Sequence, residues 1–271
     1  MKVSGLDVHK DTIFCAIYDG KKYGEVKEFA TFSEAILTMG RMLQQEGVKK
    51  IAIESTGIYW IPVWNILEEE GFDLMLINPY LIKQMPGRKS DVKDAQWIAK
   101  LLHKGLLRGS LVPCKTIRQL RTYSRRFVKM QGMLTRVTQE MERTLEMCNI
   151  RITSLVSKNN SVSVQKVIEK IIAGQDTIEE LACCIHGRTI NTKGELVKLS
   201  LDGQIEEHHR FNLMLAYEQY NLFLKQTESI EKKMEELCEE HYSKEIDLLM
   251  SIPGVGKQAA MQIISETGGD M

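Results

Sequence analysis

The sequence lacks several features that mark specialised classes of protein. None of its 271 residues belongs to an uncharged apolar run of about 18 residues, which excludes a transmembrane helix. Its six cysteines form no C-x-x-C pair, and a chain this long has no need of disulfides, so a reducing cytoplasm is the expected compartment. The acidic Asp7 stands where a secretory signal peptide keeps its apolar core, which argues against secretion. What remains, with 43% hydrophobic and 27% charged residues, is the composition of an ordinary globular protein.

Net charge is absent too, since 36 basic residues balance 36 acidic ones. That balance is an average over two blocks of opposite sign. Between Lys83 and Arg136, fourteen basic residues face two acids, a balance of +12. Between Asp202 and Asp247, five basic residues face twelve acids, a balance of −7. Such a protein can hold a polyanion at its basic middle and repel it elsewhere, unless the two blocks are solvated helical faces that pair with each other.

The first part of the chain alternates predicted strands and helices. Strands are expected at 2–9, 12–18, 22–29, 51–54 and 72–77, and helices at 33–46, 58–70 and 90–104, with Ser33 and Ser90 as N-caps and Gly47 and Gly71 as helix ends. The order β-β-β-α-β-α-β-α begins as an antiparallel meander and ends with parallel crossovers. It therefore predicts a mixed sheet with helices on its faces.

The remainder is predicted to be helical. Apolar residues recur at a 3-4 spacing along two seams, the first at Leu120, Tyr123, Phe127, Met130, Leu134, Val137, Met141 and Cys148, with Thr144 in its one gap, and the second at Leu213, Ala216, Tyr220, Phe223, Thr227, Ile230, Met234, Leu237 and His241. They predict two long antiparallel helices, with short helices near 162–173 and 177–185 at the tip; an intermolecular coiled coil is the alternative. A last helix is expected at 258–266, and the domains at 1–112, 113–245 and 246–271.

Four carboxylates are candidates for a metal site. Asp7 lies inside an apolar strand, where a charge is costly to bury without a partner, and Glu54 closes a second such strand. Asp91 and Asp94 share one face of a predicted first helical turn. Oxygen ligands of this kind bind Mg²⁺, and a pair of such ions can activate a nucleophile and stabilise the leaving oxygen of a phosphodiester. The alternatives are that Asp91 and Asp94 only favour the helix dipole and that Glu54 faces solvent.

The basic block contains a stripe at spacings of three and four residues, made of Arg118, Arg121, Arg125 and Lys129. A stripe of one sign is suited to gripping phosphates without reading sequence, although it is also compatible with a solvated face. His9 and Lys10, which follow Asp7, and the pair Arg88-Lys89, which precedes Asp91, are further candidate contacts to nucleic acid. His9 and Lys10 are equally compatible with an ordinary surface turn.

The turn that precedes the last predicted helix carries Gly254, Gly256 and Lys257. It is not a nucleotide-binding P-loop, because Ser251 stands where that motif needs glycine and Gln258 where it needs serine or threonine. It is typical of a helix-hairpin-helix, whose backbone N–H groups can hold one phosphate, or of an ordinary turn between helices.

These motifs in combination resemble those of a known family. They are Gly5-Leu6-Asp7-Val8-His9-Lys10, Glu54-Ser55-Thr56-Gly57 with Tyr59-Trp60, Asn78-Pro79, Arg88-Lys89-Ser90-Asp91-Val92-Lys93-Asp94-Ala95 with Trp97, Gly105-Leu106-Leu107-Arg108, Leu120-Arg121, Ile252-Pro253-Gly254-Val255-Gly256 and Glu266-Thr267-Gly268-Gly269-Asp270-Met271. The sequence is similar to the DEDD transposases of the "one-ten" family of insertion sequences, which includes the Piv-type invertases.

The resemblance implies a RuvC-like ribonuclease H fold followed by an antiparallel coiled-coil hairpin and a partial C-terminal helical domain. It implies that Asp7, Glu54, Asp91 and Asp94 hold Mg²⁺ and carry the catalysis. It further implies a DNA transposase and site-specific recombinase that works with a structured guide RNA, the bridge RNA, and assembles as a homo-oligomer.

The resemblance also implies a later domain with a nucleophilic serine that attacks DNA. The sequence ends before that part, and neither Ser251 nor Ser265 stands at the matching position, so we expect a truncated transposase with impaired recombination. The alternatives are a stand-alone Mg²⁺-dependent, structure-selective nuclease and a non-catalytic DNA-binding or oligomerisation fragment.

Overall fold

The computed structural model describes residues 1–80, 91–155 and 161–269, and for residues 91–93 it describes the backbone alone. The chain folds into two compact units, Met1–Val112 and Pro113–Met271. Predictions that fall on Arg88, Lys89 and Ser90 lie outside the described residues.

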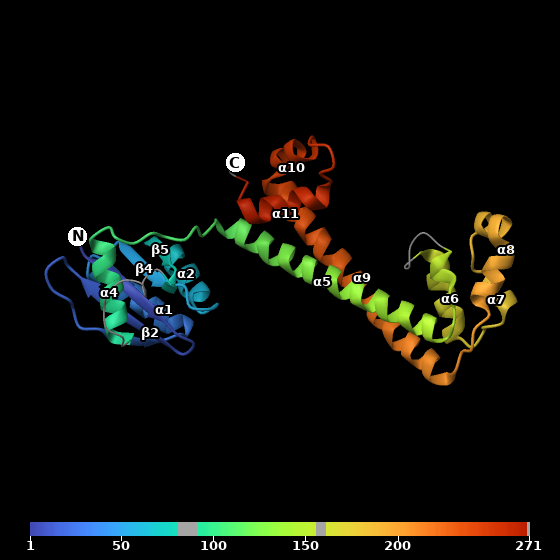
Figure 1. Cartoon of the computed structure of the whole chain (residues 1–271). Helices are drawn as coiled ribbons and strands as arrows, with labels where there is room; N and C mark the ends of the chain where they lie inside the picture. The colour runs from blue at the N-terminus through green and yellow to red at the C-terminus, as the bar shows by residue number, and fades with distance from the viewer. Residues whose placement is uncertain (81–90, 156–160, 270–271) are drawn as a thin grey trace. The chain divides into compact units, whose positions relative to one another are not determined.

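The first unit is built on a five-stranded mixed sheet (Figure 1). Its elements are β1 (Val3–Val8), β2 (Thr12–Tyr18), β3 (Lys27–Ala30), α1 (Ser33–Gln45), β4 (Lys50–Glu54), α2 (Trp60–Glu69), β5 (Asp73–Ile77) and α4 (Asp91–His103). The strand order is β3-β2-β1-β4-β5. The first three strands pair antiparallel, and β1, β4 and β5 pair parallel. This topology confirms the predicted mixed sheet with flanking helices.

Helices cover both faces of the sheet. On one face, α1 and α2 pack on the larger core, represented by Leu6, Ile53, Leu43 and Leu67. On the other face, α4 packs on a smaller core. Every residue of β1 is buried, as expected for a central strand covered on both sides.

The helix α4 lies unusually close to β1 because residue 5 is glycine. A Cβ at Gly5 would stand 2.4 Å from the carbonyl oxygen of Ala95 and 2.5 Å from the amide nitrogen of Ala99. Further along, Leu102 packs with Val3 in the same core. The helix therefore begins above the carboxyl end of β1 and runs back towards its amino end.

Two local predictions in this unit were wrong. The third strand starts at Lys27 rather than at residue 22, because the chain bulges away from β2 after Gly24 donates to the carbonyl of Ile17. Ser33 is the first residue of α1, and the N-cap is Phe32, whose side chain makes no capping hydrogen bond. The predicted end is confirmed: Gly47 follows α1 with a φ of +72°, a conformation that glycine adopts at least cost.

The second unit is a hairpin of two long helices, α5 (Lys115–Met147) and α9 (Glu207–His241) (Figure 1). They run antiparallel, since Phe127 of α5 packs with Met234 of α9, whereas Met141 packs with Leu213. The seams thus meet within one chain. Near the end of α9 the predicted seam drifts: Cys238 is buried, whereas Leu237 is half-buried and His241 is exposed.

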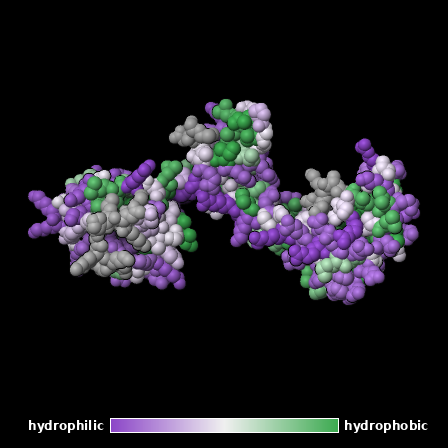
Figure 2. Space-filling model, viewed as in Figure 1, coloured by the Kyte–Doolittle hydropathy of each residue, from purple (hydrophilic) through white to green (hydrophobic). Residues whose placement is uncertain are grey.

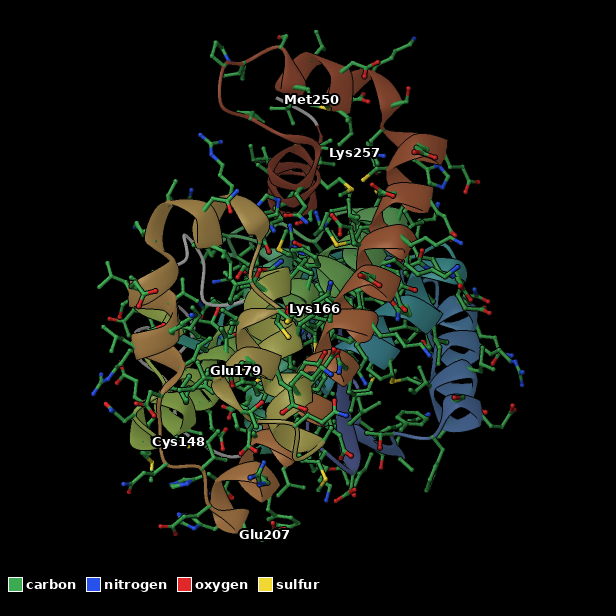
Figure 3. All side chains as sticks on the ribbon, turned by 90° about the vertical axis from the view of Figure 1, so that its right-hand side faces the viewer. Cys148, Lys166, Glu179, Glu207, Met250 and Lys257 are labelled. Carbon is green, nitrogen blue, oxygen red and sulfur yellow. The ribbon has the colours of Figure 1, made fainter. Side chains whose placement is uncertain are left out.

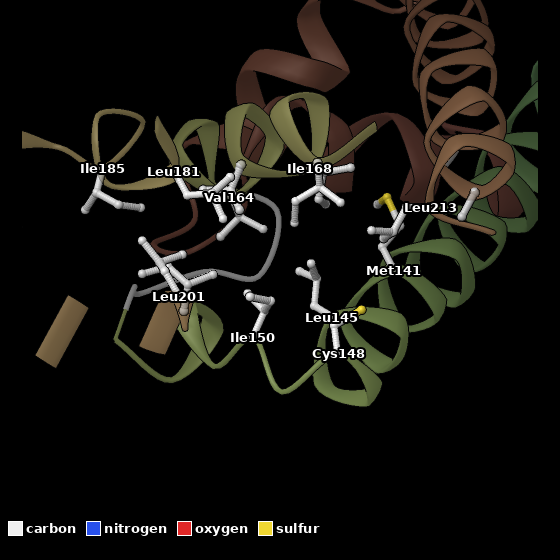
Figure 4. Close-up of a cluster of buried hydrophobic side chains, with 14 of the residues drawn as sticks. Met141, Leu145, Cys148, Ile150, Val164, Ile168, Leu181, Ile185, Leu201 and Leu213 are labelled. Carbon is white, nitrogen blue, oxygen red and sulfur yellow. The ribbon is translucent and has the colours of Figure 1, made fainter. Parts of the chain in front are cut away.

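The tip of the hairpin carries a core of its own, drawn in Figure 4. It is formed by α6 (Val162–Ile172), α7 (Ile178–Ala182), the short 3-10 helix Ile152–Ser154 and α8 (Gly187–Leu201). The sequence patterns predicted α6 and α7 but not α8. Within α8 the buried residues are only Val197, Ser200 and Leu201, too few to produce a helical period.

At the other end of the hairpin, α10 (Ser243–Met250) and α11 (Lys257–Thr267) pack on α5 and α9. Figure 2 shows a largely hydrophilic hairpin surface, with hydrophobic side chains gathered over α10. Among the described residues, no helix is long and apolar enough to cross a membrane.

Candidate metal and nucleic-acid site

Asp7 is a buried carboxylate near the carboxyl end of β1. It is 4% exposed, and its Oδ2 lies 3.2 Å from Nε2 of His9. Because side chains alternate along a strand, Asp7 points to the same face as Gly5, which is the face that α4 covers.

Glu54 ends the neighbouring strand β4. In the parallel register Leu6 stands beside Ile53, so Asp7 and Glu54 are the next residues on adjacent strands. Ala52, two residues before Glu54, packs against α4, and the alternation of side chains places Glu54 on that face as well. Oε1 of Glu54 accepts a hydrogen bond of 3.3 Å from the hydroxyl of Thr56.

Asp94 enters from the helix layer. It directly precedes Ala95, whose carbonyl lies over Gly5, and it is half-buried. Asp91 is the first residue of α4, one turn earlier, but its side chain lies outside the described residues. The fold therefore brings Asp7, Glu54 and Asp94 to one face at one edge of the sheet.

The described side chains do not yet form a complete metal site. Within residues 1–80, 94–155 and 161–269, no three His, Cys, Asp or Glu side chains lie close enough together to hold an ion. The donor chemistry nevertheless fits a hard divalent cation, since all the candidates are carboxylates. Like charges on adjacent strands repel each other, and a cation bound between Asp7 and Glu54 would offset that repulsion.

Two members of the basic stripe contact the end of α11. Arg121 donates from Nε to the carbonyl of Ser265 and from Nη2 to that of Glu266, both at 2.9 Å. Arg125 donates twice to the Glu266 carboxylate, at 3.0 and 3.1 Å, and these hydrogen bonds lower the pKa of Glu266. The two arginines thus complete the last turn of α11, where backbone carbonyls lack helical partners.

The other two members of the stripe differ. Arg118 donates to the carbonyl of Pro113 at 2.8 Å, next to the start of α5. Lys129 is exposed, as is its neighbour Arg126. Two of the four stripe residues, Arg121 and Arg125, therefore hold α11 in place. The role of the stripe in binding nucleic acid stays a prediction.

The predicted hairpin turn lies between α10 and α11. Gly254 has a φ of +89°, and Gly256 is the N-cap of α11. Lys257, labelled in Figure 3, forms ion pairs of 3.1 Å with both Glu235 and Glu239 of α9, which raise the pKa of its amine. The lysine therefore anchors α11 to α9.

The β1–β2 turn places Lys10 in solvent, with its carbonyl accepting a hydrogen bond of 3.0 Å from the Thr31 hydroxyl. Sequence reasoning missed the contacts of His9 and Thr56 with the acids. The spacing was visible in the sequence, because each residue follows its acid by two positions, but the turns that bring them together were not. It also missed exposed apolar side chains beyond the ends of β4 and β5, Ile58 at 71% and Tyr80 at 65%.

A family model described as Transposase, that of the DEDD transposases of the IS110 ("one-ten") insertion sequences, matches residues 4–150. The chain belongs to this transposase family. The matched range contains the four acids and the whole basic stripe of the transposase.

The transposase was also compared with solved structures and with curated proteins. The transposase is similar to T. thermophilus RuvC in complex with a Holliday junction substrate, at 13% identity and a TM-score of 0.30, over 41% of this chain and 99% of the other. A second structure of Thermus thermophilus RuvC gives 14% identity and a TM-score of 0.29, over 41% and 100%. No curated protein matches significantly.

Proposed function

We propose that this transposase cleaves and transfers DNA strands, with Mg²⁺ held by Asp7, Glu54, Asp91 and Asp94. The observation that carries the proposal is the placement of Asp7 and Glu54 side by side on adjacent strands, under the start of the helix that bears the other two acids. Family membership supports the reaction class.

Each acid has a distinct part in this proposal. Bound Mg²⁺ would activate the attacking oxygen and neutralise charge on the phosphate. Asp7, the most buried acid described, supplies a rigid anchor within β1. Glu54 stands at the strand end, where a phosphodiester has access. Asp91 and Asp94 belong to α4, whose position is set by its contact with Gly5, so the helix determines how far they stand from the strand acids.

Exposed basic side chains are the basis for proposing nucleic acids as partners. Lys10 is exposed beside the acids, and Arg126 and Lys129 are exposed on α5. Contacts from such side chains hold phosphates but carry no sequence information. We therefore include a guide (bridge) RNA, whose base pairing would select the DNA target.

A homo-oligomer is also part of the proposal. Most of the seam between α5 and α9 is buried or half-buried within one chain, so we expect a second copy to use an outer face of the hairpin. Exposed apolar residues at Phe211, Leu215 and Leu222 follow one face of α9 and support such a contact.

The test is a cleavage and strand-transfer assay on branched and linear DNA, with Mg²⁺ and with or without guide RNA. Asp7→Asn and Glu54→Gln are expected to abolish product while leaving the fold intact. Glu25→Gln, which alters an exposed carboxylate in the β2–β3 loop, serves as the matched control. Unchanged product formation by Asp7→Asn would show that the site assignment is wrong. Cleavage without any transfer would favour a stand-alone nuclease.

A further inference from the structure

Each of the two strand acids has a polar partner two residues further along the chain. His9 Nε2 lies 3.2 Å from Oδ2 of Asp7, and Thr56 Oγ1 lies 3.3 Å from Oε1 of Glu54. The same relation, an acid followed by a donor at the second position, thus occurs on two neighbouring strands.

The main chain fixes both partners. The amide of His9 donates to the carbonyl of Thr12 at 2.8 Å, which closes the β1–β2 turn. The His9 ring meets Phe14 edge-on, with ring centroids 6.1 Å apart, and Phe14 stands opposite Asp7 in the sheet. The amide of Thr56 donates to the carbonyl of Glu54 at 3.0 Å, which turns the hydroxyl back over the carboxylate.

We propose that His9 and Thr56 are positioning residues that hold the carboxylates of Asp7 and Glu54 in the orientation needed to bind a divalent cation. The inference rests on the proposed function, in which these two acids are metal ligands. The Asp7 side chain is 6% exposed and the His9 side chain 40%, so the ring extends from the buried acid towards solvent. Carboxylate ligands are commonly oriented by such outer hydrogen bonds, and losing one typically weakens metal affinity about 10–100-fold.

The test measures Mn²⁺ affinity of the full chain by calorimetry, with the Mn²⁺ electron paramagnetic resonance spectrum as a second readout. Thr56→Val keeps the shape of the side chain without the hydroxyl, and His9→Leu removes the ring donor. Each is expected to weaken Mn²⁺ binding about 10–100-fold. Thr56→Ser and His9→Gln keep a donor at a similar reach and are expected to restore most of the affinity.

A control at the same edge of the sheet separates positioning from general disturbance. Thr31→Val removes a hydroxyl that donates to the carbonyl of Lys10, a contact that involves no carboxylate, and should leave Mn²⁺ affinity unchanged. Urea unfolding followed by tryptophan fluorescence checks that each variant folds.

The outcomes distinguish the two proposals. If Asp7→Asn abolishes Mn²⁺ binding but Thr56→Val and His9→Leu bind as the wild type does, positioning is refuted and the proposed function stands. If Asp7→Asn binds Mn²⁺ as the wild type does, both are refuted. Failure of Thr56→Ser and His9→Gln to recover affinity would also overturn the inference, because the donor would not be what matters.

Discussion

Replacing Gly5 with alanine should separate α4 from the sheet. The added Cβ would stand 2.4 Å from the Ala95 carbonyl and 2.5 Å from the Ala99 amide, whereas ordinary contact begins near 3.4 Å. The obstruction is backbone, which cannot rotate away as a side chain can. The helix therefore has to retreat by about 1 Å, and overpacking of this kind costs about 1–3 kcal/mol.

The consequence for the site is larger than that for stability. Asp91 and Asp94 move with α4, whereas Asp7 and Glu54 stay on the strands. A displacement of about 1 Å at a catalytic site can lower the rate about 100-fold. We therefore expect Gly5→Ala to weaken Mn²⁺ binding and to lower Mg²⁺-dependent cleavage by about that factor, while the protein remains folded.

The stability effect can be followed in the first unit alone. All three tryptophans, Trp60, Trp64 and Trp97, lie in that unit, so their fluorescence reports its unfolding in urea. With a denaturant slope of about 2 kcal/mol/M, a cost of about 1–3 kcal/mol should lower the midpoint by about 0.5–1.5 M. Gly24→Ala is the matched control, because its Cβ would find its nearest atom at 3.7 Å. A Gly5→Ala variant with wild-type midpoint and Mn²⁺ affinity would refute the close approach of α4 to β1.

Three further predictions concern the second unit. Phe127→Ala, which empties a core position 2% exposed, should destabilise the hairpin by about 3–5 kcal/mol in urea unfolding followed by circular dichroism; a loss below about 1 kcal/mol would contradict the packing. Arg125 holds the pKa of Glu266 below its ordinary 4.5, so this pair stabilises the fold above that value and ceases to do so as pH falls through the lowered pKa. Glu266→Gln should therefore shrink the difference in urea midpoint between about pH 7 and about pH 3, and an unchanged difference would show that the pair contributes nothing. Thr177→Ala breaks the capping box with Glu180 and should cost about 1 kcal/mol, visible as faster amide exchange in α7.

Local sequence pattern was enough to predict most of the secondary structure and the class of the fold. Alternation and apolar runs located the five strands, and the 3-4 seams located α5 and α9, because burial requires the same periodicity whatever the element packs against. The predicted ends of elements were less accurate where residue preferences alone do not fix the boundary. The start of β3 depends on where the chain resumes pairing with β2, and the N-cap of α1 depends on where the chain leaves β3; no single residue fixes either point.

The sequence by itself also nominated the four acids as a candidate site, because an acid inside an apolar strand is unusual and because the motifs around it resemble those of one family. It did not show that Asp7 and Glu54 stand side by side, since that depends on the parallel register of β1 and β4, which are some forty residues apart. Nor did it show that the absence of a side chain at Gly5 allows α4 to pack directly against β1.

The basic stripe shows most clearly what only the tertiary structure decided. From its charge and spacing, the sequence predicted that the stripe forms a surface for phosphates. In the folded chain, Arg121 and Arg125 instead bind the backbone carbonyls and the carboxylate at the end of α11, and Lys129 remains in solvent. Charge along a helix is a local property, but the partner of each charge is set by whichever element packs against it. For that reason the sequence determined where the basic residues are, and the fold determined which of them remain exposed to solvent.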